Sequence, residues 1–247
     1  MDKNSKEQDL MTSEARTSTF SNVGVTEQNT VTVKVEKEGE DGGEETEERV
    51  LTILPKYQSL YKKNKNLIGW LTIEGTDINY PVMKSIHGNG EFYLDHDYNG
   101  KEDRNGTLFM DDNCDVIKPS ENWLIYGHNM KSGKMFGNLT DYKNQAFYET
   151  HPTVKFDTIY ETGVYKVIYA FESRVYEESE IAFKYYQFID PASEAEFNSG
   201  IKEMEAASYI KSPYTVSYGD RLLMLSTCDY DEANGRFVVV CVRMEDE

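Results

Sequence analysis

The sequence predicts a mainly β fold, a barrel or sandwich of short strands to which helices are added. Two features lead to this prediction. Short runs rich in β-branched and aromatic residues recur from residue 70 to residue 243, and turn residues separate them. One strong helical pattern interrupts this series late in the chain. Many short strands with a single late helix are typical of a decorated barrel.

Local patterns place the individual elements. A short amphipathic helix is expected where apolar residues recur at helical spacing, at Leu54, Tyr57, Leu60 and Tyr61. Strands are then expected at 70–73 and 78–83, around a turn at 74–76. Pro81 cannot donate a ladder hydrogen bond, so the second of these strands should lie at an edge or contain a bulge. The other strands are expected at 107–110, 123–126, 153–156, 165–171, 221–226 and 237–243.

The late helix is expected at about 191–210. Asp190 and Pro191 supply an N-cap and a first-turn proline. Phe197, Ile201 and Met204 follow on one face. We therefore expect this helix to pack against the sheet.

Residues 1–49 differ in composition from the rest of the chain. They hold 13 acidic against 6 basic residues and one aromatic residue, Phe20. The stretch 36–48 is almost entirely Glu, Gly and Asp, which cannot bury enough apolar surface to offset the entropy of ordering. We expect residues 1–49 to form a disordered acidic spacer, with an acidic interaction tail as the alternative. Residues 50–247 are expected to form one domain.

The charge and the cysteines exclude several classes of function. The 247 residues carry 44 Asp and Glu against 26 Lys and Arg, a formal net charge of −18. Binding of nucleic acid through its phosphates requires a basic surface, so this class is excluded. The three cysteines form no CxxC pair, which excludes a zinc knuckle and a thioredoxin-type motif.

Residues 95–100 resemble the start of a calcium-binding loop. They match its first six positions, D-x-D-x-N-G, but the twelfth position is Gly106, where a bidentate glutamate is required. We expect no metal and no cofactor, and weak calcium binding at 95–100 is left open.

Cys228 is the best candidate for a nucleophile. It follows the apolar run 222–225, so its thiol is expected at the mouth of a core strand. A structural thiol is the alternative. Cys241 lies within a run of valines and is expected in the core. Cys114 lies among carboxylates, which should raise its pKa and suppress the thiolate.

His128 is the best candidate for a general acid and base. The apolar strand 123–126 ends at Gly127, which lets the backbone turn sharply and places His128 in a cleft. The other histidines are expected in solvated loops, at His87, His96 and His151.

Arg236 is the third candidate, because it opens the last apolar strand after a turn at 234–235. If that strand is an antiparallel neighbour of the strand that carries Cys228, Arg236 returns close to the thiol. Its guanidinium could then bind a carbonyl oxygen as negative charge develops there. A surface arginine paired with Asp229 or Asp231 is the alternative.

With His128, Cys228 and Arg236 in this order at strand ends, the sequence resembles the sortases, and most closely class B. Sortases are cysteine transpeptidases that attach proteins to Gram-positive cell walls. The family motif T-L-x-T-C corresponds to residues 224–228, where Met224 replaces the first Thr. Further similarity covers much of 50–247 and includes Ile-Gly-Trp at 68–70, Asn-Tyr-Pro-Val at 79–82, and the blocks 106–110, 125–131 and 135–136.

The resemblance implies an eight-stranded sortase-type β-barrel with N-terminal helices and a long helix before the Cys-bearing strand. It implies that Cys228 cleaves a sorting signal after Thr through a thioacyl-enzyme. His128 would move protons, and Arg236 with a backbone N–H would stabilise the oxyanion. The substrate groove implied by the family is formed by Leu94, Tyr126, Ile181, Ser226 and Thr227.

The resemblance also implies partners and a location. The partners are surface proteins with a C-terminal sorting motif, NPxTN-like or [S/P]PxTG-like, and an amino group of a peptidoglycan precursor or cross-bridge. We expect a monomer at the extracellular face of the membrane, anchored by an N-terminal helix that has been trimmed from this chain. Alternatives are a pilin-polymerising sortase, a catalytically silent sortase-like binding module, and a hydrolase that resolves the same thioester with water.

Overall fold

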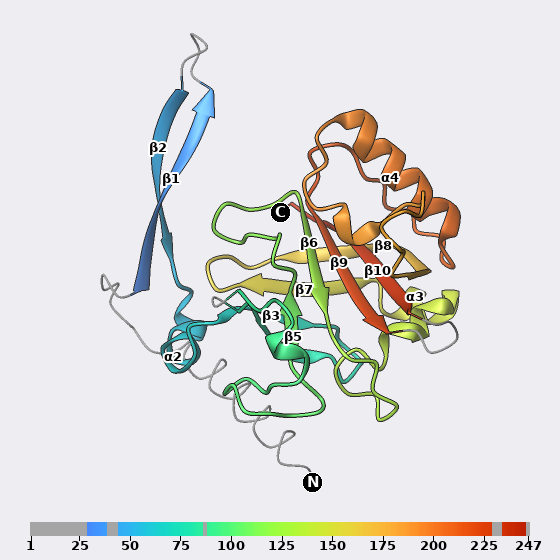
Figure 1. Cartoon of the computed structure of the whole chain (residues 1–247), viewed down its shortest axis with the longest axis horizontal. Helices are drawn as coiled ribbons and strands as arrows, with labels where there is room; N and C mark the ends of the chain where they lie inside the picture. Colours follow the sequence, from blue (N-terminus) through green and yellow to red (C-terminus); the bar gives the residue numbers. More distant parts are fainter. Residues whose placement is uncertain (1–28, 39–43, 86–87, 229–233, 246–247) are drawn as a thin grey trace.

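A computed structural model describes residues 29–38, 44–85, 88–228 and 234–245. Each of the eight strands expected from the sequence is present, as β3 (Leu67–Thr72), β4 (Asn79–Met83), β5 (Leu108–Met110), β6 (Asn122–Tyr126), β7 (Thr153–Thr158), β8 (Val164–Arg174), β9 (Leu222–Cys228) and β10 (Gly235–Arg243). They close into a barrel in the order β10-β8-β7-β3-β4-β5-β6-β9 (Figure 1). The predicted mainly β fold and its eight-stranded barrel are confirmed.

The pairing of β6 with β9 positions the functional site. It is one of two parallel pairs in the barrel, the other being β4 with β5. Asn122 lies opposite Leu222, and Tyr126 lies opposite Ser226. Parallel strands in register end at the same end of the barrel. The segments that follow Tyr126 and Ser226 therefore leave the barrel side by side.

The core explains why the last two strands are continuous apolar runs. Residues 222–225 of β9 and 237–240 of β10 are all fully buried. Strands covered on both faces have no reason to alternate apolar and polar residues. The helix α4 (Glu194–Ala207), drawn in orange in Figure 1, packs on the neighbouring strand β8 and buries Phe197, Gly200 and Met204.

The helices agree in part with the sequence prediction. The first predicted helix is α2 (Pro55–Lys63), and α4 lies between the sixth and seventh barrel strands, as the resemblance implied. Short helices that the sequence did not reveal are η3 (Phe92–Leu94), η4 (Leu139–Lys143), α3 (Gln145–Thr150) and η5 (Tyr185–Gln187). Each is too short to show a helical period. Within the described ranges, no helix has the length and apolar character needed to cross a membrane.

The start of α4 differs from the prediction. Its N-cap is Ser193, whose hydroxyl accepts a hydrogen bond from the backbone N–H of Glu196 at 3.3 Å. The carboxylate of Asp190 instead accepts from the backbone N–H of Glu121 at 2.8 Å. Asp190 thus joins the connection before α4 to the start of β6 and does not cap the helix.

Pro81 does not lie at an edge, because the barrel is closed. It lies opposite Trp70 of β3, whereas β5 pairs only with Val82 and Met83 of β4. Pro81 therefore has one strand partner, and a missing N–H is tolerated there. The bulge predicted at Pro81 is not observed in the register of β3 with β4; the register shift of this pair lies in β3, between Leu67 and Gly69.

Within the segment 1–49, which was expected to be a disordered spacer, the described residues 30–38 and 44–49 lie in strands. Strands β1 (Thr30–Glu38) and β2 (Glu44–Thr52) form an antiparallel hairpin that pairs Thr30 with Thr52 and Glu38 with Glu44 (Figure 1, blue). The physical reason lies in the sequence: Val and Thr or Lys alternate over 30–35, a pattern of high β propensity. The boundary at residue 49 falls inside β2. Residues 1–28 and 39–43 lie outside the described part of the chain.

Candidate active site

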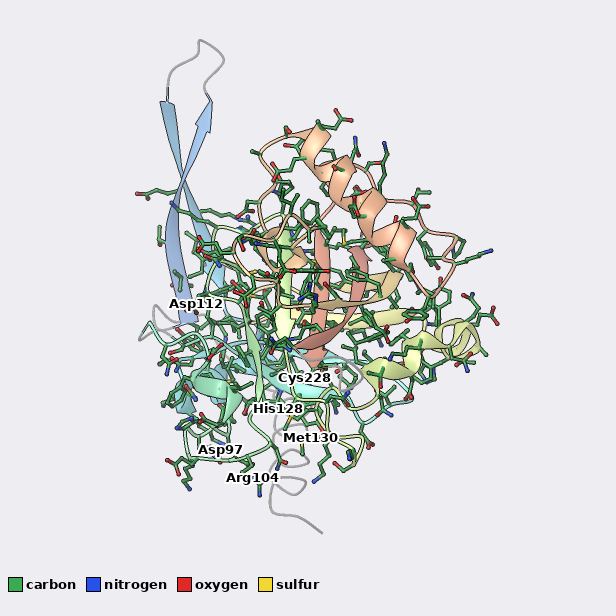
Figure 2. The ribbon with its side chains drawn as sticks, turned by 45° about the vertical axis from the view of Figure 1, so that its right-hand side comes forward. Asp97, Arg104, Asp112, His128, Met130 and Cys228 are labelled. Carbon is green, nitrogen blue, oxygen red and sulfur yellow. The ribbon has the colours of Figure 1, made fainter. Side chains whose placement is uncertain are left out.

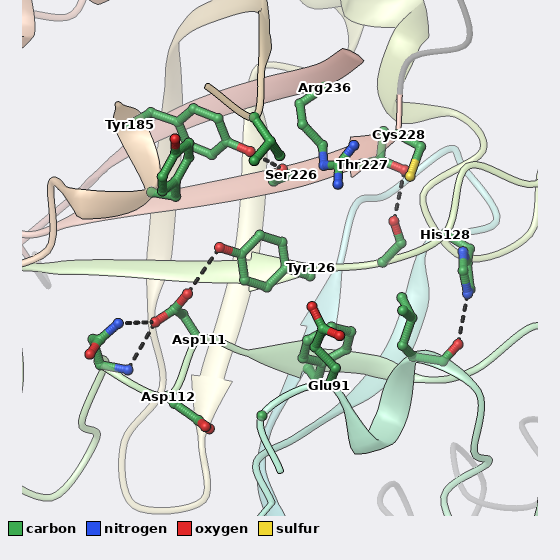
Figure 3. A pocket seen from close by; sticks show the side chains of 17 residues that line it. Glu91, Asp111, Asp112, Tyr126, His128, Tyr185, Ser226, Thr227, Cys228 and Arg236 are labelled. Carbon is green, nitrogen blue, oxygen red and sulfur yellow. Dashed lines mark hydrogen bonds between the residues drawn. The ribbon is translucent and has the colours of Figure 1, made fainter. Parts of the chain in front are cut away.

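A cavity of about 380 Å³ opens at the end of the barrel where β6 and β9 finish. Figure 2 shows His128 and Cys228 at this end, and Figure 3 shows the cavity from close by. Most of the residues predicted from the sequence line it, namely Leu94, Tyr126, His128, Ser226, Thr227, Cys228 and Arg236. The structure thus brings together the three predicted catalytic residues and four of the five predicted groove residues.

Hydrogen bonds join the two segments that carry the nucleophile and the histidine. The backbone N–H of Gly127 donates to the carbonyl of Ser226 at 3.2 Å. The hydroxyl of Thr227 donates to the carbonyl of Gly127 at 2.7 Å, and the side-chain amide of Asn129 donates to the carbonyl of Cys228 at 2.9 Å. His128 and Cys228 are therefore fixed relative to each other by their own flanking residues.

Gly127 is required for a reason other than the predicted one. A Cβ added there would lie 2.4 Å from a methyl carbon of Leu108 and 2.8 Å from the ring of Phe136. Its φ does not lie in the left-handed region. Close packing at the end of β6, rather than an unusual turn, excludes a side chain immediately before His128.

Arg236 reaches the site through strand register. It lies directly opposite Cys228 in the antiparallel pair of β9 and β10, as expected from the sequence. Its guanidinium lines the cavity (Figure 3) and donates to the carbonyl of Gly235 at 2.9 Å. The alternative partners, Asp229 and Asp231, lie outside the described residues.

Cys228 is the accessible thiol of the three. It is half-buried at the end of β9, whereas Cys114 and Cys241 are fully buried. Burial raises the pKa of Cys114 to about 12, and the nearby Asp111 carboxylate adds a smaller effect in the same direction. Burial also raises the pKa of Cys241. The prediction that Cys241 is a core residue is confirmed. The pKa of Cys114 is raised as predicted, but burial is the main cause and the carboxylates are a minor one.

The remaining histidines have structural contacts. The Nδ1 atom of His96 is 2.7 Å from the carbonyl of Phe92, and its ring stacks on the Phe92 ring. The Nδ1 atom of His151 is 3.0 Å from the carbonyl of Phe147. Neither lines the cavity. His87 lies outside the described residues.

The hydroxyl groups of two predicted groove residues form hydrogen bonds with other groups of the protein. Ser226 and Thr227 are 1% and 2% exposed. The Ser226 hydroxyl is hydrogen-bonded to the hydroxyl of Tyr185 at 2.8 Å, and burial raises the pKa of Tyr185 to about 12. Tyr185, on η5, was not predicted from the sequence. It fixes the connection before α4 to the strand that carries the nucleophile.

Three carboxylates on the cavity wall were also missed, those of Glu91, Asp111 and Asp112. Asp111 accepts a hydrogen bond from the hydroxyl of Tyr126 at 2.9 Å. Burial, with the Asp111 charge as the next cause, raises the pKa of Tyr126 above its ordinary value. The acidic run 111–115 was visible in the sequence, but only the fold places it beside the site.

Ile181 does not lie where the resemblance suggested. Its side chain is fully exposed and does not line the cavity. From the same connection between β8 and α4, Val175 and Tyr186 line the cavity instead. The groove role predicted for Ile181 is thus not supported by this geometry, because its stretch of the connection turns to solvent.

The described residues contain no cluster of three or more His, Cys, Asp or Glu side chains that could bind a metal ion. In the calcium-like stretch, the carboxylate of Asp97 accepts from the backbone N–H groups of Asn99 and Lys101, at 2.8 and 2.9 Å. This carboxylate stabilises its own turn. The expectation of no metal stays a prediction.

The chemistry of the site defines a class of protein. An accessible thiol, an imidazole and a guanidinium surround one cavity on three adjoining strand ends. A thiol can form a thioester, an imidazole can carry protons, and a guanidinium can stabilise an oxyanion. The fold and the site together define a cysteine acyltransferase built on a closed β-barrel.

Comparison with known proteins gives the family. The model of the sortase domain matches residues 71–244. Sortase B of Staphylococcus aureus is 32% identical over 190 residues, which cover 76% of this chain and 74% of that protein. The structure of a Staphylococcus aureus sortase B–substrate complex is 30% identical, with a TM-score of 0.69, and covers 79% of this chain and 87% of that one. Sortase B complexed with triglycine is 31% identical, with a TM-score of 0.68, and covers 78% and 87%.

The chain belongs to the sortase family, and within it to class B. It is a cysteine transpeptidase that attaches proteins to the cell wall.

Proposed function

We propose that the protein cleaves a C-terminal sorting signal after Thr, through a thioacyl-enzyme at Cys228, and transfers the acyl group to an amino group of peptidoglycan. The observation that carries this proposal is the convergence of Cys228, His128 and Arg236 on one cavity. Hydrogen bonds between the ends of β6 and β9 keep the nucleophile and the histidine in fixed relation.

The proposed reaction has two halves. The Cys228 thiolate attacks the carbonyl carbon of Thr, and the guanidinium of Arg236 stabilises the oxyanion. His128 as imidazolium donates a proton to the leaving amine when the C–N bond breaks. The neutral imidazole then accepts a proton from the incoming amine as that amine attacks the thioester. The thiolate leaves, and the resting enzyme is restored.

The partners follow from the chemistry and from the relatives. One similar structure is described as a sortase B–substrate complex and another as sortase B complexed with triglycine. These descriptions support an acyl donor peptide and an amine acceptor for this chain. We propose that the donors carry an NPxTN-like or [S/P]PxTG-like motif and that the acceptor is a peptidoglycan precursor or cross-bridge. Because the reaction requires both, we propose that the enzyme acts at the extracellular face of the membrane, held by an N-terminal anchor.

The experiment incubates the protein with pooled peptides of both motif types, without amine, with triglycine or with a lysine-containing pilin peptide, and identifies the products by mass spectrometry. The proposal predicts peptide–triglycine products from one motif type and none with Cys228→Ala. Products formed only with the lysine of a pilin peptide would indicate the pilin-polymerising alternative. Release of free acid at the same rate with and without amine would indicate a hydrolase. No product, together with a Cys228 that reacts with thiol probes no faster than Cys241, would indicate a binding module.

A further inference from the structure

The ring of His128 is anchored at one of its two nitrogens. Its Nε2 atom lies 2.7 Å from the backbone carbonyl oxygen of Leu94. Figure 3 marks this contact with a dashed line at the labelled His128. Across the part of the chain that the structure describes, this carbonyl is the one hydrogen-bond partner of the ring. Leu94 therefore contributes a backbone group to the site, in addition to the side chain that lines the cavity.

This contact determines where the proton of the neutral ring resides. A carbonyl oxygen has no proton to give and can only accept, so Nε2 must be the protonated nitrogen. In a neutral imidazole the other nitrogen, Nδ1, then carries the free lone pair. We propose that His128 exchanges its catalytic proton through Nδ1, while Nε2–H stays on the Leu94 carbonyl throughout the cycle. This inference rests on the proposed transpeptidase mechanism.

The proton and the electrons balance in both half-reactions. As the C–S bond forms and the C–N bond breaks, the proton on Nδ1 passes to the nitrogen of the leaving amine. As the new C–N bond forms and the C–S bond breaks, the incoming amine returns one proton to Nδ1. The Nε2–H bond is not broken in either step, and Leu94 acts as a positioning residue that fixes the ring and its tautomer.

The Leu94 carbonyl is itself held in place. Leu94 ends the 3-10 helix η3, where its backbone N–H donates to the carbonyl of Glu91 at 2.8 Å. The adjacent carbonyl of Tyr93 accepts from the backbone N–H of Thr107 at 2.9 Å. Gly106, at φ +58°, packs beneath both carbonyls: a Cβ added there would lie 2.4 Å from the Leu94 oxygen and 2.6 Å from the Tyr93 oxygen. The absence of a side chain at residue 106 thus leaves the carbonyl free to face His128.

The first test needs no substrate, so its outcome does not depend on the proposed function. Two-dimensional ¹⁵N–¹H NMR of the histidine side chains at alkaline pH, where imidazoles are neutral, identifies the protonated nitrogen of each ring. The signals of His128 are those missing from His128→Asn. We expect Nε2 to be protonated and Nδ1 to be unprotonated. Protonation at Nδ1, or an equal mixture of the two tautomers, would overturn the proposal.

The second test moves the carbonyl without touching His128. Gly106→Ala should displace the Leu94 carbonyl oxygen and lower the fraction of His128 rings protonated at Nε2. It should also reduce kcat by about 100-fold, which is the effect expected when a catalytic group is misplaced by about 1 Å. The matched control is Gly100→Ala in the same loop. Gly100 is at φ +75°, so alanine there has a comparable backbone strain, but the nearest atoms are ring carbons of Phe92 at 3.9 Å.

Thermal unfolding of both variants tests that each is folded. Gly100→Ala is expected to keep the wild-type tautomer and kcat. If Gly106→Ala matches Gly100→Ala in tautomer and in kcat, the Leu94 carbonyl does not position the ring and the proposal fails. If Gly106→Ala does not fold, the tautomer measured in the wild-type protein decides alone.

Discussion

Replacing Thr227 by valine removes one hydroxyl group and leaves the shape of the side chain almost unchanged. That hydroxyl donates to the carbonyl of Gly127 at 2.7 Å, and Thr227 is only 2% exposed. A buried hydrogen bond contributes about 1 kcal/mol net, and a buried acceptor left without its donor costs about 1–3 kcal/mol. Thr227→Val should therefore lower the free energy of unfolding by about 1–3 kcal/mol, or Tm by about 2–12 °C for a domain of this size.

The same substitution should also reduce activity, because the bond joins the residue before Cys228 to the residue before His128. Urea unfolding measures the stability, and steady-state transpeptidation measures kcat. Thr227→Ser is the matched control, since it keeps the hydroxyl and loses only a methyl group. If Thr227→Val is as stable and as active as Thr227→Ser, the bond between the two strand ends does not have the role assigned to it.

Three further predictions follow from the site and from one ion-pair cluster. Arg236→Lys should lower kcat/KM about 100-fold with a fluorogenic sorting peptide, because lysine lacks the planar set of donors. A near-normal kcat/KM would contradict this prediction. Iodoacetamide should label Cys228 much faster than the two buried thiols, and peptide mapping that finds rapid native-state labelling of Cys114 or Cys241 would refute that ordering. Burial raises the pKa of Glu161, but ion pairs at 2.7 Å with Arg243 and 2.9 Å with Arg221 outweigh it and lower the pKa overall from 4.5. Because the pKa is lower in the folded state, the ionised Glu161 carboxylate stabilises the protein above about pH 4.5, and this stabilisation is lost as pH falls through the folded-state pKa. Urea unfolding should therefore show that Glu161→Gln destabilises the protein at pH 7 and much less at pH 3. Equal destabilisation at the two pH values would refute the assignment.

The nucleophile and the histidine could be predicted because each follows a continuous apolar run. Such runs mark buried strands, and the residues within a few positions after the run lie near a barrel end. Arg236 could be predicted because few residues separate the last two apolar runs in the sequence, and the register places it opposite Cys228. These are local patterns, which a single sequence carries.

The contact between the two strand ends could not be predicted from the residues. Gly127 and Thr227 are 100 positions apart, and the parallel pairing of β6 with β9 leaves no local signal. The same holds for Tyr185 and the carboxylate of Asp111, which reach the cavity only through tertiary packing. Ile181 was misplaced because it was transferred from the family into a connection of irregular backbone.

The helix cap and the hairpin were missed for different reasons. Asp190 precedes a proline, as an N-cap can, but its carboxylate accepts from the backbone N–H of Glu121. The observed cap, Ser193, forms the local Ser-x-x-Glu pattern with Glu196, a signal that the prediction did not use. The prediction for 1–49 rested on acidic composition and did not use the alternation of Val with polar residues over 30–35.

The intact mass of the enzyme during turnover of a sorting peptide without amine detects the thioacyl-enzyme itself. We expect a mass increase equal to the acyl fragment that ends in Thr, which is the free acid less one water. This adduct should be removed by hydroxylamine, map to Cys228 and be absent from Cys228→Ala. An adduct on another residue, or peptide cleavage by Cys228→Ala at the wild-type rate, would contradict it.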